Sequence, residues 1–126
     1  MLKPTRSLSL LTLCAALLLA AAAPAPAPAA TGYVTAGVTR VLISDDDRWG
    51  GCMAALSVDP QTVLSSCGSA WVTFSCSGQF TNSVRAYRMV DAAELALATG
   101  KNVTVYFQDD KMHNGYCFAN RIDAIR

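Results

Sequence analysis

The sequence predicts one small exported domain, built mainly of β-strands with a single helix and held together by two disulfides. Three observations predict it. A basic segment at Met1–Arg6 precedes an apolar run at Leu8–Ala23 and a series of small residues, which is the layout of a secretory signal peptide. Four cysteines follow this leader. The periodic segments come in the order strand, strand, strand, helix, strand, strand.

The leader predicts the compartment and the domain boundary. Ala27-Pro28-Ala29 places small residues at positions –3 and –1 of a cut, so we expect a signal peptide of residues 1–29 and a single domain of residues 30–126. An earlier cut after Ala22 would leave an alanine-proline spacer. No second apolar run or basic stop-transfer flank follows, so we expect a secreted or periplasmic protein without a membrane span.

The charge and the cysteines of the mature chain narrow the class further. Its 97 residues carry eight basic and nine acidic side chains, and without a basic excess we expect no nucleic acid partner. So small a domain is marginal without covalent links. An even number of cysteines in an exported chain predicts two disulfides, with three connectivities open. The cysteines are Cys52, Cys67, Cys76 and Cys117. Their spacing contains no Cys-x2–4-Cys pair, which disfavours a metal site.

The first two strands are predicted from residue type and alternation. Tyr33–Ile43 is rich in Val, Thr and Ile, with Gly37 as an expected bulge. Asp45–Gly51 has the composition of a turn. Cys52–Val58 is a short apolar strand, which Asp59-Pro60 ends because proline cannot donate to a β-ladder.

A third strand and a helix follow. Trp71–Cys76 alternates with period two, as a half-buried strand does. Ser83–Thr99 repeats its apolar residues with helical spacing, and Asn82 and Gly100 suit its two caps. The stripe expected to face the core consists of Ala86, Met89, Val90, Ala93 and Leu97.

Two strands complete the chain and suggest a topology. Val103–Gln108 alternates apolar and polar residues, Asp109–Gly115 is expected to be a polar loop, and Tyr116–Arg126 is expected to be the fifth strand. Five strands with a helix between the third and fourth predict an all-β, OB-like Greek-key barrel. The alternative is a small sheet with a helix on one face.

Several short motifs resemble a known family. They are the Cys52–Cys67 spacing, Trp71, Ala86-Tyr87, Thr99-Gly100 and Val103-Thr104-Val105-Tyr106. Together they resemble the receptor-binding B subunits of subtilase-cytotoxin-type and typhoid-toxin-type exotoxins and their small secreted relatives. The resemblance implies an OB-fold subunit that forms rings and binds sialylated or related glycans. It also implies a disulfide between Cys52 and Cys67. We predict a second disulfide between Cys76 and Cys117, which would help to close the barrel.

The chain also departs from these toxin subunits. Leu97 and Ala98 stand where the toxin subunits carry aromatic residues before Thr-Gly. Their second cysteine pair lies close together near the C-terminus, whereas Cys76 and Cys117 are far apart in the sequence. We therefore expect a non-toxin relative of the fold.

The turn after the first strand is the candidate binding site. Trp49 offers a flat apolar face that can stack on a sugar ring, Arg48 offers donors, and Asp45, Asp46 and Asp47 offer acceptors. The alternative is that Trp49 tucks into the end of the barrel. The three aspartates resemble the start of a calcium loop, but the later Gly and Glu of that motif are missing, so we expect no metal.

No constellation predicts catalysis. His113 is the only histidine, and no serine lies in a Gly-x-Ser-x-Gly elbow. We expect His113 to lie in a solvated loop that turns at Asn114-Gly115. The protein is thus predicted to be no enzyme and to need no cofactor.

The helix has a second face opposite the predicted stripe, with Val84, Tyr87, Arg88, Asp91 and Leu95. It is either the exposed back of a monomer or a face for a homo-oligomer. The predicted function is therefore a non-enzymatic binding module for a glycan or a protein receptor. The alternative is an envelope accessory or inhibitor protein that binds another protein.

Overall fold

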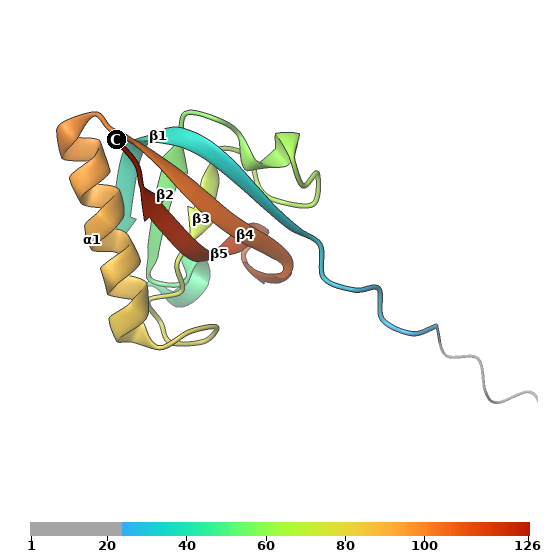
Figure 1. Cartoon of the computed structure of the whole chain (residues 1–126). Helices are drawn as coiled ribbons and strands as arrows, with labels where there is room; N and C mark the ends of the chain where they lie inside the picture. Colours follow the sequence, from blue (N-terminus) through green and yellow to red (C-terminus); the bar gives the residue numbers. More distant parts are fainter. Residues whose placement is uncertain (1–23) are drawn as a thin grey trace, which may run out of the picture.

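The computed structural model describes residues 24–126. Most of the predicted signal peptide, residues 1–29, lies outside the described residues. Residues 24–30 are exposed and have no regular secondary structure. They leave the domain on the side away from the α-helix (Figure 1). From residue 31 onwards the elements follow the predicted order.

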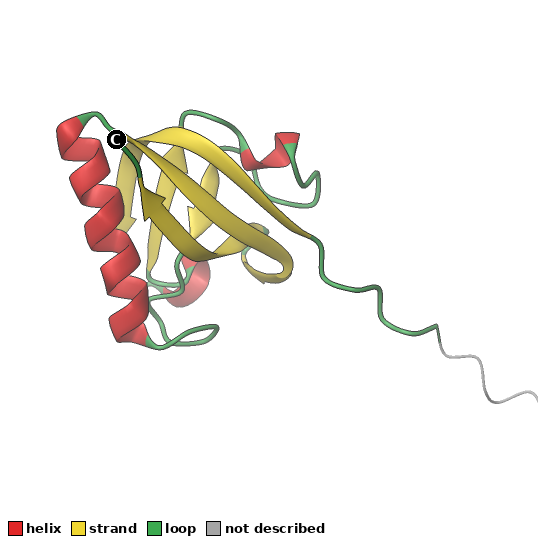
Figure 2. Cartoon of the chain, in the orientation of Figure 1, coloured by secondary structure: helices red, strands yellow, loops and turns green. Residues whose placement is uncertain are grey.

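The domain consists of five strands and one α-helix in the described part of the chain. They are β1 (Thr31–Ile43), β2 (Cys52–Leu56), β3 (Trp71–Thr73), α1 (Ser83–Thr99), β4 (Asn102–His113) and β5 (Tyr116–Ala124). The hydrogen-bonded order β1-β2-β3-β5-β4 returns to β1, and α1 covers one side of the sheet (Figure 2). This confirms the predicted sheet-rich fold class. The ring is irregular, because β3 and β5 are joined only through the parallel pair Thr73 and Phe118.

The strand β1 joins two parts of the ring because it changes partner along its length. Its first half pairs with β4 as far as Gly37, and its second half pairs with β2 from Val38 onwards. The register shifts between Val38 and Arg40, immediately after the expected bulge at Gly37. Such a bulge bends a strand and increases its twist, which lets one strand complete both sides of a small ring.

The helix α1 has the predicted bounds and caps. Asn82 accepts a hydrogen bond from the Val84 N–H at 2.8 Å, and Gly100 ends the helix in the left-handed conformation. The buried side consists of Ala86, Val90, Ala93 and Ala96. Successive buried positions are four, three and three residues apart. Because an interval of three residues is less than one helical turn of 3.6 residues, the buried stripe passes through Ala96 and leaves Leu97 at its edge. For that reason the placement of Leu97 in the core was wrong, and its side chain is 42% exposed.

The strand β4 is longer than its alternation predicted. The segment Asp109–Gly115, expected as a loop, continues the strand to His113, and only Asn114 and Gly115 form the turn. The register between β4 and β5 shifts between Gln108 and Met112, so the intervening polar residues form a bulge within the ladder. A bulge interrupts the alternation of faces, and this is why the polar run resembled a loop.

Both predicted cysteine pairings were wrong. The disulfides join Cys52 to Cys76 and Cys67 to Cys117, with Cα–Cα distances of 5.5 and 5.2 Å. A disulfide requires Cα atoms about 4.4–6.8 Å apart, so spatial neighbours decide the pairing. The Phe74 N–H donates to the Cys52 carbonyl at 3.2 Å, which brings the segment after β3 alongside the start of β2. Cys117 is the second residue of β5, and it lies beside Cys67 in the loop before β3.

Candidate functional site

A row of aromatic and cationic side chains crosses the outer face of three neighbouring strands. Tyr33 of β1 is the register partner of Tyr106 of β4, which is the partner of Arg121 of β5. The neighbours Val34 and Val105 are buried, whereas Tyr33 is 60% exposed. Since successive side chains in a strand point to opposite faces, this row faces the solvent.

The three side chains of this row are in contact. The two tyrosine rings have centroids 5.4 Å apart and are tilted by 34°. The Arg121 Cζ lies 4.7 Å from the centroid of the Tyr106 ring, within the range of a cation–π interaction. The ring of Tyr33 therefore remains exposed, and it lies beside the ring of Tyr106, which contacts the Arg121 guanidinium.

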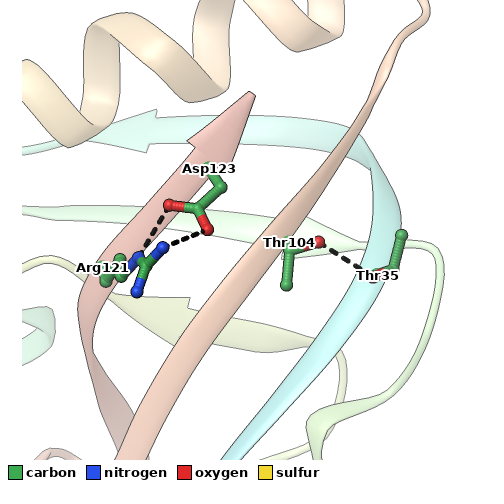
Figure 3. Close-up of polar contacts among 4 residues, drawn as sticks. All are labelled: Thr35, Thr104, Arg121 and Asp123. Atoms are coloured by element: carbon green, nitrogen blue, oxygen red, sulfur yellow. Dashed lines mark hydrogen bonds and ion pairs between the residues drawn. The ribbon is translucent and has the colours of Figure 1, made fainter. Parts of the chain in front are cut away.

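A second row of polar groups consists of Thr35, Thr104 and Asp123, which Figure 3 shows together with Arg121. Thr35 and Thr104 are register partners whose hydroxyl oxygens lie 2.9 Å apart. Asp123 accepts two hydrogen bonds from Arg121, each of 2.8 Å. These hydrogen bonds and the charge of Asp123 raise the pKa of Arg121 above its ordinary value. The guanidinium is therefore held in place, with its positive charge balanced locally.

The first row borders a groove of about 550 Å³, a volume in the range of small-molecule sites. It is lined by Thr31, Gly32, Tyr33, Tyr106, Phe107, Asn120 and Arg121. We call it the β1–β4–β5 groove. The Asn120 amide donates to the Gln108 Oε1 at 2.9 Å at one end of it. Aromatic faces flanked by hydroxyl, amide and guanidinium groups can bind a ligand that has both apolar and polar faces.

None of these groove residues was among the predicted site residues. In the sequence, Tyr106 and Thr104 belong to the polar side of an alternating strand and to the motif of the family resemblance. The available signal was their type, because threonine and tyrosine on the outward positions of β1 and β4 offer hydroxyl groups and rings to solvent. Their juxtaposition depends on the pairing of β1 with β4, two segments about 70 residues apart, and no local pattern reveals such a pairing.

The structure brings the predicted site residues together in a single turn. Asp47–Trp49 form the short 3-10 helix η1, and Asp46 caps it by accepting the Arg48 N–H at 2.8 Å. The Arg48 guanidinium lies 3.8 Å from the Asp46 carboxylate and 5.5 Å from the Trp49 ring centroid. Asp45 is exposed at the preceding bend. Part of the polar set therefore stabilises the turn itself.

Trp49 lies at the edge of a smaller hollow of about 190 Å³. We call it the Trp49 cleft, and its lining residues are Leu42, Trp49, Met53, Trp71 and Tyr116. Trp49 is half-buried, so it neither stands free nor disappears into the core. The Arg40 guanidinium lies 6.0 Å from the Trp71 ring centroid at the same cleft. Tryptophan, tyrosine and arginine are the residues that dominate protein-binding energies.

His113 is not in a solvated loop, which corrects that expectation. Its side chain is 5% exposed and its Nε2 lies 3.0 Å from the Ser75 hydroxyl oxygen. The centroid of its ring lies 4.5 Å from that of Phe80, with the two rings tilted by 40°. Burial lowers the pKa of His113, and the charge of Asp47 opposes this shift. Ser75 is fully buried as well. The pair serves to fasten the end of β4 to the segment after β3.

The outer face of α1 is exposed in the single chain. Val84, Tyr87 and Leu95 are 69%, 46% and 60% exposed, and Arg88 forms an ion pair of 3.6 Å with Asp91.

Among residues 24–126, no three metal-binding side chains gather into a group that could hold an ion. Within the same residues no helix has the length and apolar character to cross a membrane.

Comparison with protein-family models, with curated proteins and with solved structures finds no match to this chain.

Proposed function

We propose that this protein is an exported, non-enzymatic binding module and that it binds a saccharide in the β1–β4–β5 groove. One observation carries the proposal, namely the row of Tyr33, Tyr106 and Arg121 across three paired strands. A sugar ring presents an apolar C–H face and a rim of hydroxyl groups. An exposed tyrosine ring matches the face, and guanidinium, amide and threonine groups match the rim.

The charge in the groove refines the ligand class. Asp123 neutralises Arg121 through two hydrogen bonds of 2.8 Å, so the groove offers hydrogen-bonding groups without a strong field. A charged arginine held in this way still has donors for a hydroxyl or a carboxylate. The site therefore suits neutral sugars and tolerates an acidic one, such as the sialylated glycans that the sequence resemblance implies.

Other features favour the same class. The strand order β1-β2-β3-β5-β4 with one helix before β4 is compatible with the OB-type barrel that the sequence predicts, a fold used for oligosaccharide binding. Two disulfides are typical of proteins in oxidising compartments, in agreement with the proposed signal peptide. The mature chain has a slight acidic excess, which disfavours the nucleic acids that other OB-type domains bind.

A glycan array on the purified mature protein, followed by calorimetry with the best ligand, tests this proposal. We expect Tyr33→Ala and Tyr106→Ala each to weaken binding about thirtyfold, the effect typical of losing a central aromatic. Ile43→Ala is the control, because it removes an exposed apolar side chain at the far end of β1, outside the groove and outside α1. Retained affinity in both groove variants, or the absence of any glycan bound, would contradict the proposal.

A second candidate function is supported by the Trp49 cleft. Its two tryptophans and a tyrosine surround a shallow hollow with Arg40 and Arg48 at the rings, which is the composition of a protein-binding hot spot. The protein would then be an accessory or inhibitor of another envelope protein. Binding of a protein that persists in Tyr33→Ala and is lost in Trp49→Ala, at unchanged thermal stability, would favour this function over the first.

Assembly into a homo-oligomer is part of the first proposal and would use the exposed face of α1. Val84, Tyr87 and Leu95 give this face its apolar character. Light scattering on the mature protein measures the oligomeric state, and we expect Leu95→Glu to reduce an oligomer to monomers. A wild-type protein that is monomeric at all accessible concentrations would exclude this assembly.

A further inference from the structure

We propose that export processing after Ala29 creates an internal ion pair, in which the new α-amino group of Ala30 binds the carboxylate of Asp109. The pair exists only in the mature chain, because it requires both the cut after Ala29 and the carboxylate of Asp109 on β4. This inference rests on the proposed export of the chain. It is independent of what binds in the β1–β4–β5 groove or in the Trp49 cleft.

Asp109 already holds Ala30 from two directions. The Ala30 N–H donates to the Asp109 Oδ1 at 2.8 Å, and the Asp109 N–H donates to the Ala30 carbonyl at 3.1 Å. The second carboxylate oxygen, Oδ2, accepts a hydrogen bond from the Ser66 hydroxyl at 2.9 Å. The carboxylate is therefore oriented by a neighbouring loop, with one oxygen directed at the backbone nitrogen of Ala30.

Ala30 is also the residue at which the domain begins. Thr31 is the first residue of β1 and pairs with Gln108, whereas residues 24–29 are exposed and irregular. A cut after Ala29 would remove the irregular segment and retain the whole ladder. A cut after Ala22 would leave a neutral amide at Ala30, so the ion pair can form with only one of the two cleavage sites that the sequence leaves open.

The chemistry of the cut changes the strength of this contact. Hydrolysis of the Ala29–Ala30 bond by a signal peptidase consumes one water, and Ala29 leaves with a carboxylate while the nitrogen of Ala30 becomes an amine. With an ordinary pKa of about 7.7–8.0, an α-amino group is mostly protonated at neutral pH. A neutral N–H···O bond thereby becomes a charge-assisted one, which is roughly twice as strong.

The first measurement is the intact mass of the protein exported from a host that processes its own leader. We expect a chain that begins at Ala30. If the chain is retained with its leader, the export proposal fails. If it is exported but begins at another residue, export stands and the ion pair proposed here is excluded.

The second measurement compares the effect of one substitution on the melting temperature in two chains of different length. Asp109→Asn is made in the chain that begins at Ala30 and in a longer chain that begins at Ala23. We expect it to lower the melting temperature by about 3–5 °C in the short chain and by about half as much or less in the long chain, the scale expected for one partly exposed charged pair in a domain of this size.

Asp110→Asn is the matched control, because it removes the same charge one residue further along β4. Asp110 accepts a hydrogen bond from Gln108 and not from Ala30, so its effect should be independent of where the chain begins. Equal effects of Asp109→Asn in the short and the long chain would overturn the inference.

Discussion

Two positions on the helix α1, four residues apart, provide a sharp test of how the helix packs. Ala93 is fully buried against the sheet, whereas Leu97 is 42% exposed, although both belong to the stripe predicted from helical spacing. We expect Ala93→Asp to prevent folding and Leu97→Asp to be tolerated. The same residue is introduced in both variants, so the difference between them reports on burial.

The magnitudes follow from the surroundings of each side chain. At position 93 a carboxylate would enter an apolar contact without a partner, which costs several kcal/mol, and its extra atoms would overpack the interface by about 1–3 kcal/mol. The sum approaches the whole stability of a small domain. At position 97 the helix propensity falls by about 0.5 kcal/mol. A negative charge in the last turn also interacts unfavourably with the helix dipole, which lowers the free energy of unfolding by a further amount of about 0.3–1 kcal/mol.

Thermal unfolding followed by circular dichroism measures both variants under identical conditions. With about 1 kcal/mol lost, Leu97→Asp should melt roughly 4–8 °C below the wild type, and Ala93→Asp should show no cooperative transition. Leu97→Asn separates the charge from the loss of the leucine. If Leu97→Asp unfolds the protein as completely as Ala93→Asp does, the described orientation of the helix is wrong.

Three further predictions address the covalent links, the buried histidine and the turn beneath it. Peptide mapping without reduction should find the two described disulfides, and a peptide joining Cys52 to Cys67 would contradict them. Because burial lowers the pKa of His113 in the folded protein, the unfolded chain binds a proton more readily. The free energy of unfolding should therefore be highest above about pH 6.5 and fall as the pH drops through the folded pKa. His113→Gln should remove this component, and an unchanged pH profile in that variant would refute the assignment. Gly50→Ala should destabilise the protein far more than Gly115→Ala in urea unfolding. Both glycines have φ near +80°, but a Cβ at Gly50 would overlap the His113 ring whereas one at Gly115 meets open space.

The elements that depend on neighbouring residues were predictable from the sequence. Asn82, the helical spacing and Gly100 lie within one segment, and they gave the bounds of α1 as the structure has them. Val103, Val105 and Phe107 likewise alternate within β4 and are all fully buried. In such segments the propensity and the pattern of burial agree, so tertiary contacts add little information about where an element begins and ends.

The candidate site depends on long-range pairings and could not be predicted in this way. Tyr33 and Tyr106 meet because β1 pairs with β4, and the same strand alternation would be compatible with other partners. The sequence hypothesis chose Trp49 because its neighbours in the chain, Arg48 and the aspartates, already form a polar set. The structure supports their proximity but uses Asp46 to cap the turn, which leaves fewer groups there to bind a ligand.

The distribution of covalent and hydrogen-bonded links suggests why the groove lies where it does. β3 has only three residues, and its link to β5 is a single parallel pair. The disulfides fasten the segments on either side of it, Cys67 before the strand and Cys76 after it. On the chain-entropy model they contribute about 3.5 and 4 kcal/mol, which is comparable to the net stability of a small domain.

Neither disulfide joins β1 to β4 or β4 to β5. β1 and β4 pair continuously from Thr31 to Gly37, and β4 pairs with β5 over most of its length. Side chains on a regular ladder are held in a defined spacing by the backbone, which is what a preorganised binding site requires. The disulfides therefore lie at the irregular seam around β3, whereas Tyr33 and Tyr106 lie on the continuous β1–β4 ladder. Arg121 pairs with Tyr106 immediately before a register shift between β4 and β5. Covalent bonds complete the ring where the ladder is short, and the long β1–β4 ladder carries the two tyrosines of the proposed binding groove.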